Sequence, residues 1–288
     1  MLAFFLAVAF AFSPADADRA FVLADRFVKD CTPRDAGTIR GRIASNFLLD
    51  EASKVGADVR RDVFMADTPK GPRQFTNLSC EFVSNVTSKW VVLVSHYDTK
   101  PGVNCSGAND GATSSALLVS LAAALQNWRT PRGNVMLLWT DGEECMEQYA
   151  DNDGFWGSRR AAAALKDSGR SVKAVVCLDM IGDADLHISV PSNGSKPLSK
   201  IAVLAASRAG YPGLVSHMAE AVKDDHVAFL DNGFAAIDLI DFEYGPGNAY
   251  WHSPDDTMEH VSEESLLKSG RLVVSLLNIL AGCRDARQ

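Results

Sequence analysis

The segment Val91–Gly111 constrains the fold of this chain more than any other part of its sequence. It begins within an almost entirely apolar run, Trp90–Ser95, and such a run is typical of a strand that is buried on both faces. The segment continues with His96-Tyr-Asp98 and with a loop rich in Gly and Asn that leads to Asp110. The sequence therefore predicts a sheet covered on both sides, with polar side chains at the end of a central strand.

Strands and helices are predicted to alternate along the rest of the chain. Apolar residues with helical spacing predict helices over Asp18–Asp30, Asp35–Gly56, Ala112–Asn127, Trp156–Lys166, Ser199–Arg208 and Ser262–Ala281. Alternating or continuous apolar patterns predict strands over Ala57–Met65, Phe75–Val83, Trp90–Ser95, Asn134–Trp139, Val172–Met180, Leu186–Val190 and Phe234–Ile240. This order is typical of an α/β fold, a three-layer α/β/α sandwich with a central mixed, mostly parallel sheet.

Polar residues also follow other apolar segments of the chain. Because functional side chains of such sheets gather at the carboxyl ends of the strands, we expect these residues to meet His96 and Asp110. His, Asp and Glu side chains supply the nitrogen and oxygen ligands of zinc sites, so we interpret the chain as a zinc enzyme. The additional clusters are Asp141-Gly-Glu143-Glu144, Asp179 and Trp251-His252.

Four of these acidic residues have a structural alternative. Asp110 precedes an apolar helix, where Asp is a common N-cap; as a ligand it would bridge two cations. Adjacent acids such as Glu143-Glu144 are often solvated, but at a strand end one can bind metal while the other moves a proton. Asp179 lies in so apolar a segment that its charge requires a metal or a hydrogen-bonding partner.

Two later segments are interpreted in the same way. Histidines are often structural, but His252 lies beside Tyr250 and Trp251, and this aromatic setting favours a ligand. Asp224-Asp-His226 has two interpretations: a solvated loop or helix cap, or a group that orients a ligand or a substrate amine.

Length, net charge and the first residues of the chain limit its possible partners, domain organisation and localisation. The chain has 288 residues and a formal net charge of -8, and without a basic stripe a nucleic-acid partner is not expected. Leu2–Phe12 and the small residues up to Ala17 resemble a secretory signal, and the run is too short to span a membrane. We therefore expect a signal peptide over residues 1–17, a single catalytic domain over residues 18–288, and a secreted or periplasmic monomer without a membrane span.

The six cysteines contain no CxxC pair, so a zinc finger is not indicated. Secretion would permit disulfides. The candidate pairs are Cys31–Cys283 and Cys105–Cys145, whereas Cys177 is expected to be a buried thiol, and the connectivity stays open.

The order of these motifs resembles the M28 zinc peptidase family, and within it the glutaminyl-peptide cyclotransferase branch. The resemblance covers nearly all of the chain after the predicted signal. The segments that carry it are His96-Tyr-Asp-Thr-Lys100, similar to HYDSK; Asp141-Gly-Glu-Glu144 with Asp153-Gly-Phe-Trp156 and Gly157-Ser-Arg159, similar to DGEE…DSLYGSR; Leu178–Gly182; Asp224-Asp-His226; and Trp251-His252.

The resemblance implies an enzyme that acts on peptide or protein N-termini. In the cyclases one zinc ion polarises the γ-carboxamide of an N-terminal Gln, the α-amine attacks it, and ammonia leaves. The resemblance implies that Asp110, Glu144 and His252 are the metal ligands. It implies that Glu143, Asp179 and Asp224 are catalytic residues, with Glu143 as the proton shuttle. Tyr149 and Trp251 would then lie in the substrate pocket.

The alternative within the same family is a dinuclear zinc aminopeptidase that hydrolyses the N-terminal peptide bond. There His96 and Asp179 would complete a second zinc site, and Glu143 would activate a water molecule. Asp238 stands where the animal cyclases have a histidine, and His252-Ser-Pro-Asp-Asp-Thr257 is similar to an aminopeptidase HTPxDT motif. The sequence favours the cyclase and leaves the aminopeptidase open.

Overall fold

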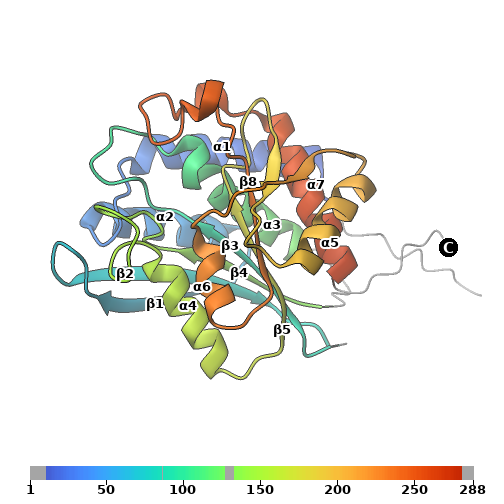
Figure 1. Cartoon of the computed structure of the whole chain (residues 1–288), viewed down its shortest axis with the longest axis horizontal. Coiled ribbons are helices and arrows are strands. Elements are labelled where there is room, and N and C mark those ends of the chain that lie inside the picture. Colours follow the sequence, from blue (N-terminus) through green and yellow to red (C-terminus); the bar gives the residue numbers. More distant parts are fainter. Residues whose placement is uncertain (1–10, 86, 127–132, 281–288) are drawn as a thin grey trace, which may run out of the picture.

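An eight-stranded mixed sheet forms the middle layer of the protein (Figure 1). The computed structural model describes residues 11–85, 87–126 and 133–280. The strand order is β1-β2-β4-β3-β5-β8-β6-β7, in which β4, β3, β5 and β8 run parallel to one another. The strands are β1 (Val59–Ala66), β2 (Arg73–Phe82), β3 (Trp90–His96), β4 (Asn134–Thr140), β5 (Val172–Asp179), β6 (Ile188–Val190), β7 (Val215–His217) and β8 (Ala236–Ile240).

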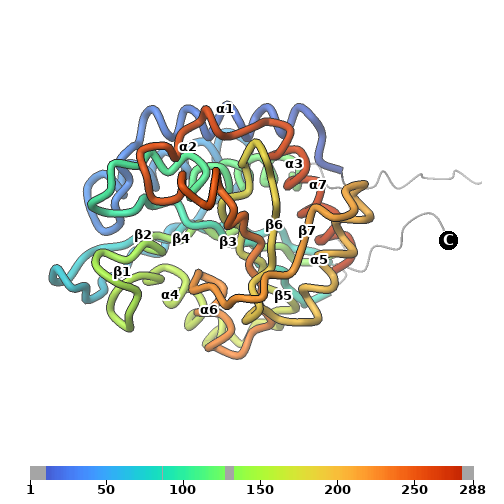
Figure 2. The backbone as a smooth tube through the Cα atoms, turned by 45° about the horizontal axis from the view of Figure 1, so that its top comes forward, coloured from blue at the N-terminus to red at the C-terminus, as the bar shows by residue number. Residues whose placement is uncertain are grey.

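Helices cover both faces of this sheet, as Figure 2 shows. On one face α1, α2, α3 and α7 pack together, with α5 beside α7, whereas α4 and α6 cover the other face. The α-helices are α1 (Pro14–Cys31), α2 (Ile39–Lys54), α3 (Ser114–Gln126), α4 (Trp156–Asp167), α5 (Lys196–Arg208), α6 (Asp225–Asp231) and α7 (Glu263–Leu280).

The predicted three-layer α/β/α sandwich is therefore confirmed, and β3 shows its physical basis. Successive side chains of a strand point to opposite faces. Val91 and Leu93 belong to the larger core under α3, whereas Val92 and Val94 belong to the smaller core under α4 and α6. All seven residues of β3 are buried, as its apolar sequence predicted.

Most predicted elements have the expected positions, with two differences. The short elements β7 and α6 were not predicted, because three and seven residues carry too little periodicity. The helix predicted from Asp18 begins at Pro14 instead. The predicted helix ends Asn127 and Ala281 lie outside the described residues.

The start of α1 is part of the folded domain. Ser13 caps the helix, with its side chain accepting from the Asp16 N–H and the Asp16 carboxylate accepting from the Ser13 N–H. Phe12 is buried against Gly270 of α7. Ala17, where signal cleavage was predicted, is inside α1 and buried, while residues 1–10 lie outside the described residues. None of the helices described here is long and apolar enough for a membrane span.

The parallel strands determine where the polar clusters meet. β3 ends at His96, β4 at Thr140 just before Asp141, and β5 at Asp179. Because these strands are neighbours and run in the same direction, their carboxyl ends lie along one edge of the sheet. The candidate site is built on this edge.

Candidate active site

Asp110 lies at a kink in the π-helical segment η1 (Ala108–Thr113). Its backbone angles, φ −81° and ψ 90°, are non-helical, and the residue at the N-cap position of η1 is Gly107. Asp110 is therefore not the N-cap. Gly111 follows with φ +93°, and a Cβ atom there would lie 2.9 Å from Cε1 of His96. Only glycine allows this close approach, which brings Asp110 beside His96.

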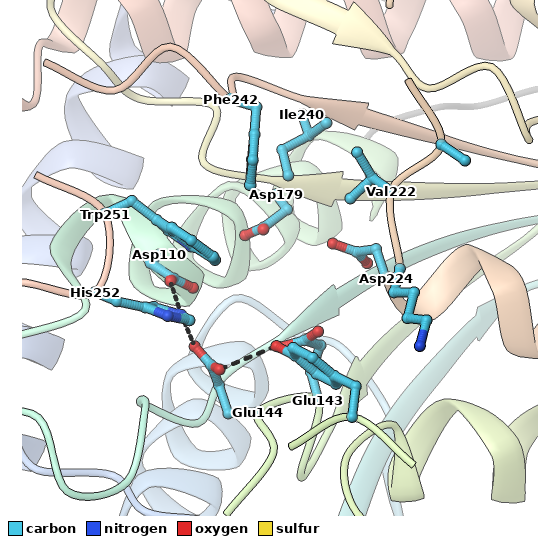
Figure 3. A pocket seen from close by; sticks show the side chains of 13 residues that line it. Asp110, Glu143, Glu144, Asp179, Val222, Asp224, Ile240, Phe242, Trp251 and His252 are labelled. Atoms are coloured by element: carbon cyan, nitrogen blue, oxygen red, sulfur yellow. Dashed lines mark hydrogen bonds and ion pairs between the residues drawn. The ribbon is translucent and has the colours of Figure 1, made fainter. Parts of the chain in front are cut away.

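A first group of possible metal ligands consists of Asp110, Glu144 and His252, whose donor atoms lie within 4.8 Å of one another (Figure 3). Nε2 of His252 is 2.8 Å from Oε1 of Glu144 and 3.4 Å from Oδ2 of Asp110. His252 has φ +51°, a left-handed conformation that is uncommon outside glycine and often marks functional sites. The structure thus brings together three residues that are 34 or more positions apart in the sequence.

A second group, His96, Asp110 and Asp179, shares Asp110 with the first. Nε2 of His96 is 3.0 Å from Oδ1 of Asp110 and 3.1 Å from Oδ1 of Asp179. The two oxygens of Asp110 therefore face two different histidines. This is the geometry that a carboxylate needs to bridge two cations.

Glu143 belongs to neither group, although it is adjacent to Glu144. The backbone N–H groups of Glu143 and Glu144 both donate to the carboxylate of Asp98, at 3.2 and 3.1 Å. The hydroxyl of Tyr149 is 3.4 Å from Oε2 of Glu143. Burial, together with the charges of Glu144 and Asp224, holds the pKa of Glu143 well above its ordinary value. A carboxyl group in this setting is suited to accepting and returning a proton.

Four residues that support the site were not assigned a role from the sequence. Asp98 holds the Glu143-Glu144 backbone, and Asn109 joins η1 to the end of β5 by accepting from Gly182 N and donating to Met180 O. Asp256 accepts from the Asn109 N–H at 2.8 Å. Arg34 binds the backbone of the loop before η1. The HxD spacing from His96 to Asp98 could have pointed to Asp98. The other three residues bind backbone groups far away in the sequence, and no local motif reveals such contacts.

The site opens into a pocket of about 250 Å3. Trp251 stacks on the ring of His252, with centroids 3.9 Å apart, and contacts Phe242 at 5.0 Å. Tyr149 stacks on Phe155, with ring centroids 4.7 Å apart. Figure 3 shows Asp179 and Asp224 facing the same space as Glu143. The predicted pocket residues Tyr149 and Trp251 both line this cavity.

Asp224 is the N-cap of α6, as one of its two interpretations predicted, and it also lines the pocket. Asp224 also belongs, together with His226 and Asp238, to a third group of buried donor atoms. Burial raises the pKa of Asp224 and Asp238 well above their ordinary values, as do neighbouring carboxylates. These groups are therefore suited to holding protons behind the site.

The candidate disulfide Cys105–Cys145 is not present, since both residues are buried free thiols. Cys145 instead contacts the Lys100 ammonium, which also lies 3.4 Å from Glu144. Cys177 is a buried thiol as expected, and Cys283 lies outside the described residues.

The charges of the site fit a bound cation. Among the described residues, Lys100 is a cation that forms an ion pair with one of these possible ligands, Glu144. The site contains several more buried carboxyl groups than this one ammonium can neutralise. Burial of unpaired carboxylates is very unfavourable. Burial works against protonation of His252, but hydrogen bonds with Asp110 and Glu144 raise its pKa to about 9. The buried carboxyl groups at the site include Asp98, Asp110, Glu143, Glu144, Asp179 and Asp224.

Comparison with known proteins identifies the family. The model of peptidase family M28 matches residues 77–277. The chain belongs to peptidase family M28. This match includes all of the candidate site residues, and the family prediction made from the motifs is confirmed.

Among the relatives of this M28 chain is the glutaminyl-peptide cyclotransferase of Drosophila melanogaster, 27% identical over 90% of this chain and 81% of that protein. The crystal structure of an Acidobacteriales bacterium glutaminyl cyclase has a TM-score of 0.87 and 28% identity, and covers 93% of this chain and 95% of that one. A leucine aminopeptidase precursor from Bacteroides thetaiotaomicron has the same fold, with a TM-score of 0.80, 22% identity and coverage of 91% and 96%.

Proposed function

We propose that this M28 enzyme is a zinc-dependent glutaminyl-peptide cyclotransferase, which converts an N-terminal Gln of a peptide into pyroglutamate and releases ammonia. The observation that carries the choice of the cyclase is sequence identity, which is 27% and 28% with glutaminyl cyclases but 22% with the leucine aminopeptidase precursor that covers a similar share of the chain. Glu143, a buried carboxyl group beside the Asp110–Glu144–His252 group that is not one of its members, supplies the proton acceptor that the reaction needs.

The proposed zinc ligands are Asp110, Glu144 and His252, because two carboxylates and one imidazole leave a coordination position open for substrate. A zinc ion bound there would polarise the γ-carboxamide of the substrate. Glu143 then accepts the proton of the attacking α-amine and returns it to the leaving ammonia. Asp179 and Asp224 face the amine side of the pocket and stabilise its charge, while Trp251 and Tyr149 confine the Gln side chain.

The alternative is a dinuclear aminopeptidase, and the His96–Asp110–Asp179 group favours it. In that reaction Glu143 takes a proton from a water molecule that attacks the first peptide bond. Both candidates use the same residues, so substrate and zinc content must distinguish them.

The test compares a Gln-initiated peptide with Leu- and Ala-initiated peptides of equal length, using protein saturated with zinc. We expect the first peptide to lose ammonia while the others stay intact, and metal analysis to give near one zinc ion per chain. Release of free Leu or Ala, with near two zinc ions per chain, would instead establish the aminopeptidase.

A matched pair of variants tests the division of roles between the two acids. Glu143→Gln removes the proton acceptor but no ligand, so we expect loss of turnover, by at least about 100-fold, with zinc still bound. Glu144→Gln removes a ligand, so zinc content should fall together with activity. Zinc loss in Glu143→Gln, or retained activity in both variants, would contradict this assignment.

A further inference from the structure

A second cavity adjoins the catalytic pocket. It has a volume of about 770 Å3, and Phe242 lines both cavities. Its walls come from the loop between β5 and β6 and from the loop after β8. Because a peptide continues beyond its first residue, and the catalytic pocket is small, the rest of the substrate needs a path outside that pocket.

The lining of this cavity is acidic. Asp183 and Asp185 come from one wall and Glu243 from the other, and none of the described lining residues is Lys or Arg. Asp185 and Glu243 are exposed at the surface. Beneath them, buried Asp241 accepts from the backbone N–H groups of His187 and Glu243.

The surrounding sequence contains no cation that would neutralise these charges locally. Residues 174–195 and 224–267, which include both walls, contain no Lys or Arg. The acids that line the cavity are Asp183, Asp185 and Glu243, and a concentration of one charge in a cavity attracts ligands of the opposite charge.

The cavity also offers an aromatic surface. The ring of Tyr250 lines it and stacks on His260, with centroids 3.9 Å apart. An aromatic face next to carboxylates suits the aliphatic stem and the charged end of a Lys or Arg side chain. Gly247 on the same wall leaves the backbone open to a peptide, since nothing lies within 4 Å of the position that a Cβ atom would take there.

We propose that this cavity binds the residues that follow the N-terminal Gln, and that it selects peptides with Lys or Arg among them. The inference rests on the proposed cyclotransferase function and adds a substrate class to it. The catalytic pocket recognises the first residue, while Asp185 and Glu243 recognise positive charge farther along the chain.

The experiment uses Gln-initiated peptides of equal length with Lys, Ala or Glu placed in turn at positions 2, 3 and 4. At one position or more, kcat/KM should be about tenfold higher for Lys than for Glu, with Ala between them, and added salt should reduce the ratio. Equal kcat/KM values for Lys and Glu at all three positions would overturn the proposal.

Two double variants with the same change in charge show where the preference comes from. In Asp185→Asn/Glu243→Gln the Lys-to-Glu ratio should fall to about 2 or less. In the control, Asp255→Asn/Glu259→Gln, two exposed acids outside the cavity lining are changed, and the ratio should stay as in the parent protein. An equal effect of both double variants would mean that overall charge, not this cavity, sets the preference, which also overturns the proposal.

Failure of this proposal is distinguishable from failure of the proposed function. If no Gln-initiated peptide loses ammonia, the cyclotransferase function is wrong. Binding of fluorescent Lys and Glu peptides to the Glu143→Gln variant then tests the cavity without turnover. Tighter binding of the Lys peptide supports the cavity as a cation-selective subsite, and equal binding rejects it.

Discussion

At the scale of single residues, position in the fold gives similar side chains different properties. Glu143 and Glu144 are neighbours in sequence, yet only Glu144 contacts His252. Glu143 belongs to neither of the two groups of possible metal ligands that contain Asp110. The difference arises because Asp98 fixes the backbone of both residues and the two side chains then point in different directions. The sequence reveals the acids, but only the fold separates their roles.

Asp241 allows a test of charge burial away from the metal groups. Burial raises its pKa to about 6, so the folded protein keeps a proton that the unfolded chain loses near pH 4. This contribution to stability is present below about pH 4 and is lost as the pH rises through 6. Between pH 4 and pH 7.5 we expect the free energy of unfolding of the wild type to fall by on the order of 2 kcal/mol more than that of Asp241→Asn. Urea unfolding of both proteins across this range measures it, and parallel curves would refute the assignment.

At the scale of elements, the loop between β3 and η1 depends on one buried arginine. The side chain of Arg34 is fully buried and donates to the carbonyl oxygens of Tyr97, Ser106 and Gly107, each at 2.8 Å. These three carbonyls lie near the two ends of the loop that connects His96 to Asp110. Arg34 therefore links the positions of both metal groups.

We expect Arg34→Lys to reduce zinc affinity about 10- to 100-fold, because one ammonium cannot reach all three carbonyls and supporting contacts of metal ligands have effects of this size. Competition with a chelator measures the affinity. The control is Arg26→Lys, which changes an exposed ion pair with Glu51 and should leave zinc binding unchanged. Unchanged affinity in Arg34→Lys, with the fold intact, would show that the loop keeps its shape without the guanidinium.

The sequence predicted the site better than it predicted the supports of the site. His96, Asp141–Glu144 and Asp179 follow long apolar strands, and parallel strands necessarily bring such ends together. Arg34, Asn109 and Asp256 act through hydrogen bonds to distant backbone groups; Asp256 and Asn109 are 147 positions apart. Such contacts depend on the final packing of loops, which periodicity does not determine.

At the scale of the whole molecule, the two ends of the described chain stabilise each other. α1 and α7 both pack on α3 in the larger core, and Phe12 fits against Gly270, where a Cβ atom would collide with its ring. Arg271 also donates to the carbonyl of Phe12 at 3.4 Å. The residues just before α1 are therefore part of the same core as the final helix.

This arrangement bears on the predicted signal peptide, because cleavage after Ala17 would fall within α1. We propose that the chain is exported. The residue at which the mature chain begins then determines which contacts at the start of α1 are retained. A chain that begins at Phe12 keeps the Ser13 cap and the contact with Gly270. A chain that begins at Asp18 lacks the cap, worth about 1 kcal/mol, and the burial of Phe12, worth about 2 kcal/mol.

We therefore expect a variant without residues 1–17 to be about 3 kcal/mol less stable in urea unfolding than a variant without residues 1–11. The variant without residues 1–11 serves as the reference, since it retains every contact described for α1. Mass spectrometry of the exported protein should accordingly place the mature N-terminus before Ser13. Equal stability of the two variants would mean that the first turn of α1 contributes nothing to the fold, and cleavage after Ala17 would then be compatible with it.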